Sequence, residues 1–169
     1  MESKKFLFVS LTGLIGDIGW QVVKEGHEVR YYIDDPEEKE IGDGFVPKVD
    51  DWEKEVAWAD VIVFDDVLGQ GAKAEKLRAE GKLVVGGSAY TDKLEDDRGF
   101  GQSELKAAGV SIIPQENFTS FDDAMAYVRK NPQRYVIKPS GEAQNHKQLL
   151  FVGEDEEAKD NLQVLQDYK

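Results

Sequence analysis

The sequence predicts an α/β protein whose first part is built on a parallel β-sheet, and three observations support this. Short apolar runs rich in β-forming residues alternate with segments of helical pattern, which is typical of βαβ units. A glycine-rich turn separates the first apolar run from the first helical segment. Beyond residue 91 the order of strands and helices changes. We therefore expect one domain over residues 1–91 and a second over 92–169.

The first domain carries four apolar runs that we expect to form strands, at residues 5–11, 28–34, 60–64 and 83–85. Helices are expected at 20–25, at 52–58 with Asp51 as its cap, and at 71–80, where Gly81 ends the pattern. The polar stretch 36–51 contains Pro36, Gly42, Gly44 and Pro47, so we expect a loop there with one short edge strand near Phe45. This order predicts a Rossmann-like parallel sheet.

The second domain begins with a helix expected over 92–108, where Asp92 and Glu95 have the spacing of a capping box. Ser120 and Asp123 have similar spacing before a helix at 122–130, which Asn131-Pro132 ends. Strands are expected at 110–114, 135–138 and 148–152, and a last helix at 155–168. A polar loop at 142–147 lies between the last two strands.

The composition excludes several classes of function. The chain has 169 residues, no cysteine, 34 acidic and 21 basic side chains, and a formal net charge of −13. Without cysteine there are no disulfides and no thiolate metal sites or nucleophiles. The acidic excess lies in both halves, so the surface repels nucleic acid and anionic membranes. No apolar run approaches the ~20 residues of a membrane span, and we expect a cytoplasmic protein that acts on small molecules.

The clearest local motif is the glycine-rich turn at 12–19, which contains Gly13, Gly16, Asp17 and Gly19. Glycines between a strand and a helix let the backbone approach a phosphate, and the helix N-terminus offers unpaired N–H groups. Alternatively, these glycines only allow tight packing of helix on strand. The pattern also resembles the nucleotide loop of extended short-chain dehydrogenases, with Asp34 and Asp35 as ribose ligands.

The dehydrogenase interpretation meets a difficulty further along the chain. That family needs a Tyr-x-x-x-Lys motif, and Tyr90 and Lys93 are one residue too close together. The two histidines, His27 and His146, have no metal-ligand spacing and are interpreted as structural or solvated residues. Lys138 ends an apolar strand, so we expect its stem to be buried and its ammonium group to be directed at a phosphate.

The order of elements and several motifs resemble the ATP-grasp superfamily, and within it phosphoribosylamine–glycine ligase. The stretch 94–100, LEDDRGF, resembles the start of a helix in that family, and 107–114 resembles the following turn and strand. The stretch 118–128, FTSFDDAMAYV, resembles the next helix, and 135–141, YVIKPSG, resembles the strand whose lysine binds ATP. The resemblance covers essentially the whole chain and implies a pre-ATP-grasp domain followed by a partial, α+β ATP-grasp subdomain.

This resemblance implies roles for particular residues. The ATP phosphates would be contacted by Arg98, Lys138, Ser140, Gly141 and Lys147, with 140–147 as a lid. The loop of Gly13, Gly16, Asp17 and Gly19 would face the phosphate of a ribose-phosphate amine. The cofactors would be ATP and Mg²⁺, with the metal ligands on a second subdomain that this sequence lacks, so that the chain is not expected to be active alone.

The resemblance leads to a functional expectation with two alternatives. We expect the N-terminal part of an ATP-dependent carboxylate–amine ligase of purine biosynthesis that works through an acyl phosphate. The lid differs from the family pattern, which keeps open a non-catalytic nucleotide-binding or interaction module. A weaker alternative is an NAD-binding Rossmann domain. The sequence indicates no metal ligands and leaves the exact substrates and the oligomeric state open.

Overall fold

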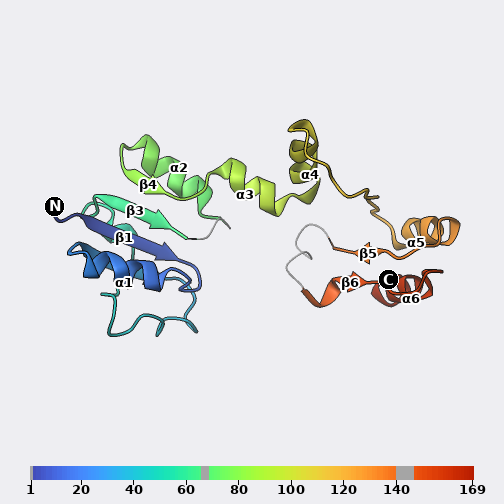
Figure 1. Cartoon of the computed structure of the whole chain (residues 1–169), viewed down its shortest axis with the longest axis horizontal. Coiled ribbons are helices and arrows are strands. Elements are labelled where there is room, and N and C mark those ends of the chain that lie inside the picture. Colours follow the sequence, from blue (N-terminus) through green and yellow to red (C-terminus); the bar gives the residue numbers. More distant parts are fainter. Residues whose placement is uncertain (1, 66–68, 140–146) are drawn as a thin grey trace. The chain divides into compact units, whose positions relative to one another are not determined.

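The computed structural model describes residues 2–65, 69–139 and 147–169 of the chain (Figure 1). The chain forms two compact units, Met1–Asp96 and Asp97–Lys169, called unit 1 and unit 2 below. The boundary expected at residue 91 falls inside helix α3 (Ala89–Asp96), which belongs to unit 1. The fold is mixed α/β and contains a parallel sheet, so the predicted fold class is confirmed.

Unit 1 is built on a sheet of four parallel strands in the order β2-β1-β3-β4. The strands are β1 (Lys5–Ser10), β2 (Glu28–Ile33), β3 (Val61–Phe64) and β4 (Leu83–Val85). They match the four predicted runs to within one residue at each end. Because all the strands are parallel, their carboxyl ends lie along one edge of the sheet, where α/β proteins bind ligands.

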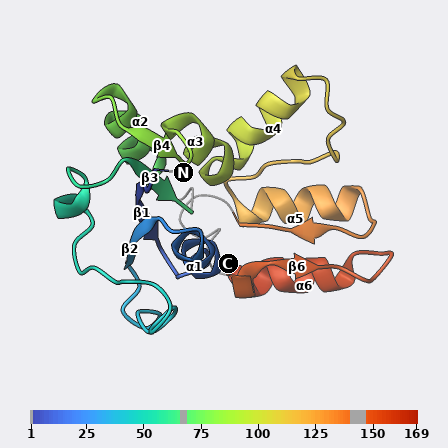
Figure 2. The same ribbon diagram turned by 60° about the vertical axis from the view of Figure 1, so that its left-hand side comes forward.

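Helices cover both faces of this sheet. Helix α1 (Gly16–Lys24) lies along β1 and packs on the face that carries Phe8 and Tyr31 (Figures 1 and 2). Helix α2 (Gly71–Ala79) packs on the opposite face through Leu77, against Leu7 and Ile62. The alternation of side chains along β1 therefore buries it on both faces, which is why its sequence is continuously apolar.

Three predicted elements of unit 1 differ in the structure. Helix α1 begins at Gly16 and not at residue 20, so the last glycines of the motif are helical. The edge strand expected near Phe45 is reduced to a single bridge between Tyr31 and Lys48, because glycines and Pro47 interrupt the segment. The helix expected at 52–58 is a 3₁₀ helix of three residues, Glu53–Glu55.

The prediction of a single helix over residues 92–108 is wrong, because two helices form in this part of the chain. Helix α3 ends at Asp96 and α4 (Arg98–Ala107) follows an extended Asp97, whose side chain accepts a hydrogen bond from the Phe100 N–H at 2.9 Å. Asp97 is thus the N-cap of α4. Asp92, which was expected to be a cap, instead accepts a hydrogen bond at 3.0 Å from the N–H of Gly71, the first residue of α2.

Within the described residues, unit 2 contains α4, two further helices and a small antiparallel sheet. Helices α5 (Phe121–Lys130) and α6 (Lys159–Tyr168) pack together, and β5 (Val136–Ile137) pairs with β6 (Phe151–Val152). A 3₁₀ helix, Lys147–Leu149, precedes β6, so the strand expected at 148–152 is shorter. The strand expected at 110–114 is absent, and its apolar side chains Val110 and Ile113 are exposed.

A buried asparagine connects α6 to β5. The Asn161 side chain is fully buried, donates to the Tyr135 carbonyl at 3.0 Å and accepts from the Tyr135 N–H at 3.3 Å. A Cβ atom at Gly153 would lie 2.2 Å from the Asn161 Oδ1 atom, so only glycine fits there. The amide thus pairs with the backbone of Tyr135 as a neighbouring strand would.

We expect Asn161→Ala to lower the free energy of unfolding of the protein by about 1–3 kcal/mol, because the buried Tyr135 N–H loses its acceptor. Urea denaturation followed by far-ultraviolet circular dichroism measures this change. Gln163→Ala is the control, because Gln163 lies on the same helix, is exposed and bonds only to Asp167, so it should change stability by no more than about 0.5 kcal/mol. Equal effects of the two variants would contradict the prediction.

Candidate functional site

A serine at the carboxyl end of β1 holds the start of the glycine-rich turn. The Ser10 hydroxyl is buried, accepts a hydrogen bond from the Gly13 N–H at 2.7 Å and donates a short one to the Asp65 carboxylate, which follows β3. The pairing of Val9 with Phe64 places Ser10 level with Asp65 at the edge of the sheet. This arrangement, here called the Ser10 clamp, joins the turn to two neighbouring strands.

A buried tyrosine lies beside the Ser10 clamp. Tyr31 is fully buried, and its hydroxyl makes no hydrogen bond within the described residues. Burial raises the pKa of Tyr31; the Ser10 hydroxyl opposes this shift, and the carboxylates of Asp65 and Asp17 add to it. Burial is therefore the main cause of the raised pKa of Tyr31, and the two carboxylates contribute in the same direction.

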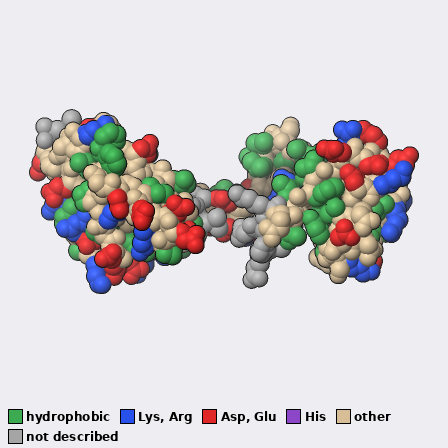
Figure 3. Space-filling model, turned by 90° about the horizontal axis from the view of Figure 1, so that it is seen from below, with side chains coloured by type: hydrophobic (Ala, Val, Ile, Leu, Met, Phe, Trp, Pro, Cys, Tyr) green, Lys and Arg blue, Asp and Glu red, His purple; other side chains and the backbone are tan. Residues whose placement is uncertain are grey.

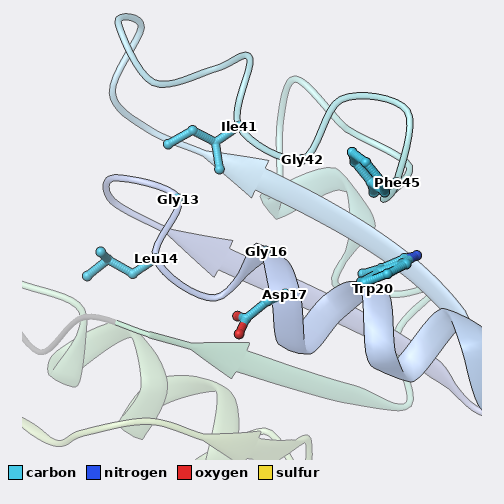
Figure 4. Close-up of a pocket in the computed structure, with 8 residues that line it drawn as sticks. All are labelled: Gly13, Leu14, Gly16, Asp17, Trp20, Ile41, Gly42 and Phe45. Atoms are coloured by element: carbon cyan, nitrogen blue, oxygen red, sulfur yellow. The ribbon is translucent and has the colours of Figure 1, made fainter.

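The glycine-rich turn forms one wall of an open hollow of about 370 Å³ (Figure 4). Gly13 and Gly16 line it, together with Asp17 and with apolar side chains of α1 and of the segment after β2. Gly13 has φ of +85°, a left-handed conformation that favours glycine, and a Cβ atom there would lie 3.0 Å from the Ile41 Cδ1 atom. The turn therefore needs glycine at this position for its own conformation.

The fourth residue of the predicted phosphate loop, Gly19, does not line this hollow. It is buried inside α1, where a Cβ atom would lie 3.5 Å from Val46 Cγ1, an ordinary packing distance. The structure therefore places Gly19 at a helix–loop contact, as the packing interpretation of these glycines expects.

Asp17 alters the chemistry expected of the α1 N-terminus. Its Oδ1 atom accepts a hydrogen bond at 2.8 Å from the N–H of Ile18, one of the groups that a bound phosphate would use. The Gly19 N–H bonds to the Ile15 carbonyl at 3.1 Å, and the Gly16 N–H points to the Gly13 carbonyl at 3.4 Å. The carboxylate of Asp17 thus already occupies part of the anion position at this helix end.

The acidic residues after β2 are already bonded within the chain. Asp34 Oδ1 accepts a hydrogen bond from the Tyr32 hydroxyl at 2.7 Å, and Asp35 Oδ1 accepts one from the Glu37 N–H at 2.9 Å. In the dehydrogenase alternative these carboxylates would bind a ribose. The contacts within the chain would have to be exchanged for that role.

In unit 2 the residues around Lys138 form an open apolar face with a cation at its end. Val136 and Val152 are directly opposite each other on β5 and β6, and are 54% and 59% exposed. Lys138 lies two residues beyond Val136, is exposed, and makes no hydrogen bond or ion pair within the described residues. The expectation of a buried Lys138 stem is wrong, because α5 and α6 cover only the other face of this two-stranded sheet, where Ile137 packs.

The other residues assigned to ATP are only partly described. Arg98 is the first residue of α4 and half-buried, and its Nε atom has no hydrogen-bond partner in the described part of the chain. Lys147 begins the 3₁₀ helix before β6. Ser140 and Gly141 lie outside the described residues, as does His146. Their role in a lid stays a prediction.

The distribution of charge is mixed on the visible surface. Figure 3 shows acidic and basic side chains interspersed over the face in view of each unit. Across residues 2–65, 69–139 and 147–169, no group of three or more His, Asp or Glu side chains is placed to hold a metal ion. The same residues include no helix that is long and apolar enough to cross a membrane.

Sequence reasoning missed the Ser10 clamp and Tyr31. A single serine inside the apolar run 5–11 carries no motif, and Tyr31 has the pattern of an ordinary strand residue. One signal was present: Asp65 directly follows a parallel strand, and the carboxyl ends of neighbouring parallel strands meet at one edge. That rule could have brought Ser10 and Asp65 together before the structure was known.

We expect Ser10→Ala to destabilise unit 1 by about 1–3 kcal/mol and to speed hydrogen exchange at the Gly13 amide, because the Gly13 N–H loses its acceptor. Hydrogen exchange followed by NMR measures both effects. Ser3→Ala is the control, since Ser3 is exposed and only donates to the Gly26 carbonyl at 3.0 Å. Unchanged exchange at Gly13 in Ser10→Ala would refute the role of the clamp.

We expect Asp34→Asn to lower the pKa of Tyr32. The hydrogen bond to Asp34 raises the pKa of Tyr32 from 10.0 to about 12, and burial adds to the shift. Because the folded pKa lies above the unfolded one, the stability from this bond is fully present below pH 10 and is lost as the pH rises towards 12. Spectroscopic titration of the tyrosine ring tests this, with Glu40→Gln as control. A Tyr32 that still titrates near pH 12 in Asp34→Asn would show that Asp34 does not cause the shift.

Comparisons with known proteins identify structures with a similar fold, but they do not assign the chain to a family. No protein-family model matches the sequence, and a search of curated proteins finds no significant match. Among solved structures, the chain is similar to N5-carboxyaminoimidazole ribonucleotide synthetase from Thermotoga maritima, with a TM-score of 0.62 and 18% identity. The match covers 94% of this chain and 43% of that one.

Two structures of N5-carboxyaminoimidazole synthetase from Staphylococcus aureus are similar to the same degree. The one complexed with ADP has a TM-score of 0.61 and 16% identity, and the other has 0.60 and 17%. Each match covers 98% of this chain and 45% of the synthetase. The chain thus spans less than half the length of these synthetases, and at such identities the likeness shows a shared fold, in which both units take part.

Proposed function

We propose that this chain is part of an ATP-dependent carboxylate–amine ligase, and that unit 2 supplies a surface for the nucleotide. The observation that carries the proposal is the open face of β5 and β6, with two exposed valines and the exposed Lys138, which has no partner among the described residues. An adenine ring has a flat apolar body, and its phosphates are anions, so this face offers both of the contacts that ATP needs.

Lys138 is the residue to which we assign the phosphate contact. Its ammonium group makes no ion pair within the described residues, so a phosphate bound there displaces none of the interactions that the structure describes. Unit 2 has other exposed cations, but three of them are already paired: Arg134 with Glu156 at 2.9 Å, Lys169 with Asp122 at 2.8 Å, and Lys159 with Glu157. Lys138 directly follows β5, two residues beyond Val136, and side chains two residues apart along an extended chain lie on the same face.

The comparisons support a ligase at the level of its class. The synthetase from Thermotoga maritima is named for a ribonucleotide, and one structure of the synthetase from Staphylococcus aureus was solved with ADP. The sequence motifs point to phosphoribosylamine–glycine ligase, which is a different synthetase of the ATP-grasp superfamily. Both interpretations share an ATP-dependent ligase that acts on a ribonucleotide-type amine, and this shared class is the function that we propose.

The proposal assigns no Mg²⁺ ligands to the described residues. ATP-grasp chemistry uses Mg²⁺, but the described residues contain no cluster of three His, Asp or Glu side chains that fits such an ion. We therefore assign no metal contact to this chain. Its own contribution is to bind the adenine ring and to hold one phosphate by charge.

We expect ADP to bind the chain weakly, and Lys138→Ala to weaken ADP binding about tenfold, the equivalent of one charge-assisted contact. Isothermal titration calorimetry with ADP, and with NAD in parallel, measures this. Lys130→Ala is the matched control, because Lys130 is an exposed cation at the end of α5 in the same unit. It should leave the affinity for ADP unchanged.

The other outcomes separate the alternatives. Binding of NAD without binding of ADP would favour the Rossmann dinucleotide alternative and overturn the ligase proposal. Binding of neither nucleotide would favour a non-catalytic interaction module. If Lys138→Ala binds ADP as well as the unchanged chain, the phosphate contact assigned to Lys138 is wrong, although the nucleotide surface itself is not.

A further inference from the structure

The hollow beside the glycine-rich turn has mostly apolar walls. Leu14 and Phe45 are 72% and 60% exposed, and the edge of Phe45 packs on Trp20 with the ring centroids 5.5 Å apart. Ile41 completes these walls. Exposed apolar side chains around a concave surface are a common feature of a ligand site. With a volume of about 370 Å³, the hollow has room for a small organic molecule.

The one charged residue among those that line this hollow is Asp17. In Figure 4 its carboxylate is drawn between Leu14 and Trp20 and points away from Ile41 and Phe45. Asp17 forms no ion pair within the described residues, and its Oδ1 atom is held by the Ile18 N–H. The lining of the hollow therefore includes one acid and an aromatic pair.

The nearby cations are already engaged. The Lys48 stem approaches Gly42, but its ammonium group binds the Asp43 carboxylate at 2.8 Å and also the Lys39 carbonyl. The Lys24 ammonium lies over the Trp20 ring, 3.9 Å from its centroid. Neither residue lines the hollow, so the charge of Asp17 is not balanced there.

The floor adds to this negative character. Behind Gly16 lies the buried Tyr31 hydroxyl, 3.8 Å from where a Cβ of Gly16 would be, and it has no hydrogen-bond partner within the described residues. Burial raises the pKa of Tyr31, and the charges of Asp65 and Asp17 raise it further. Two carboxylates thus act on the same small region, which repels an anion and attracts a cation.

We propose that this hollow binds an organic ammonium ion with a flat apolar group, and not a phosphate. The ammonium group lies against the Asp17 carboxylate, and the apolar group packs against Trp20 and Phe45. The proposal concerns unit 1 alone and does not need nucleotide binding; only its extension, that the hollow is the amine-acceptor site of the ligase, rests on the proposed function.

The test compares three probes of one shape and different charge: benzylammonium, benzyl alcohol and phenyl phosphate. Each is titrated into the isotope-labelled chain, and the amide shifts of Gly13, Gly16, Asp17 and Gly42 are followed by NMR. We expect benzylammonium to bind most tightly and phenyl phosphate most weakly. Asp17→Asn should weaken benzylammonium binding about fivefold, the upper range for an exposed ion pair, and leave benzyl alcohol unchanged.

Two further variants keep the test specific. The side-chain oxygen in Asp17→Asn can still accept the hydrogen bond from the Ile18 N–H, so this variant removes the charge without removing that contact. Glu28→Gln removes an exposed acid of the same unit outside the hollow and should have no effect. Trp20→Leu should weaken benzylammonium and benzyl alcohol alike.

Three results would overturn the proposal. If phenyl phosphate binds as tightly as benzylammonium, the hollow does not prefer a cation, and the phosphate-binding loop predicted from the sequence is the better interpretation. If Asp17→Asn and the unchanged chain bind benzylammonium equally tightly, the Asp17 carboxylate does not bind the ammonium group. Shifts confined to residues outside the hollow would place the site elsewhere. The ADP titration is independent of all three, so a failure here is distinct from a failure of the nucleotide proposal.

Discussion

The burial of β1 on both faces is the constraint on which unit 1 depends. Leu7, Phe8, Val9 and Ser10 are all buried, and β1 pairs with β2 and β3 along nearly its whole length. Because a shift of one residue would exchange the two apolar faces, the register is fixed. That register sets Ser10 level with Asp65 and so decides where the glycine-rich turn is attached. The hollow, its acid and its aromatic pair all follow from the position of this turn.

The sequence predicted the sheet well because the signal for its strands is local. Each strand of unit 1 is a run of apolar β-formers between turn residues, and such runs show in the sequence itself. The break between α3 and α4 depends on a distant contact. Asp92 has the spacing of a cap for its own helix, but the structure uses it for the Gly71 N–H, 21 residues away. Asp97 then caps α4, and no helical pattern distinguishes these two aspartates.

The candidate site was predictable in location and less so in chemistry. The glycine spacing found the turn, but not that Asp17 would bind the Ile18 N–H and compete with a phosphate. The apolar residues before Lys138 predicted a strand, and the structure contains that strand as β5. Whether its side chain is buried depends on how many faces of the two-stranded sheet are covered, and that is decided by α5 and α6. The Asp17 contact joins two neighbouring residues of α1, so the missed feature there is a side-chain conformation that the glycine spacing does not indicate. The Lys138 error concerns packing between elements, which a single sequence does not encode locally.

The distribution of charge between the units argues for different ligands in each. Unit 1, residues 1–96, has 22 acidic and 12 basic side chains, whereas unit 2, residues 97–169, has 12 acidic and 9 basic ones. The net charge of −13 therefore consists of −10 in the first unit and −3 in the second. An anion that approaches unit 1 meets a repulsive field and an acid at the hollow, while an ammonium ion meets attraction. In unit 2 the negative net charge is smaller and Lys138 is exposed on an apolar face, so a phosphate that approaches this unit meets weaker electrostatic repulsion. The uneven distribution of charge thus agrees with the two proposals made above, an ammonium ion on unit 1 and a nucleotide on unit 2.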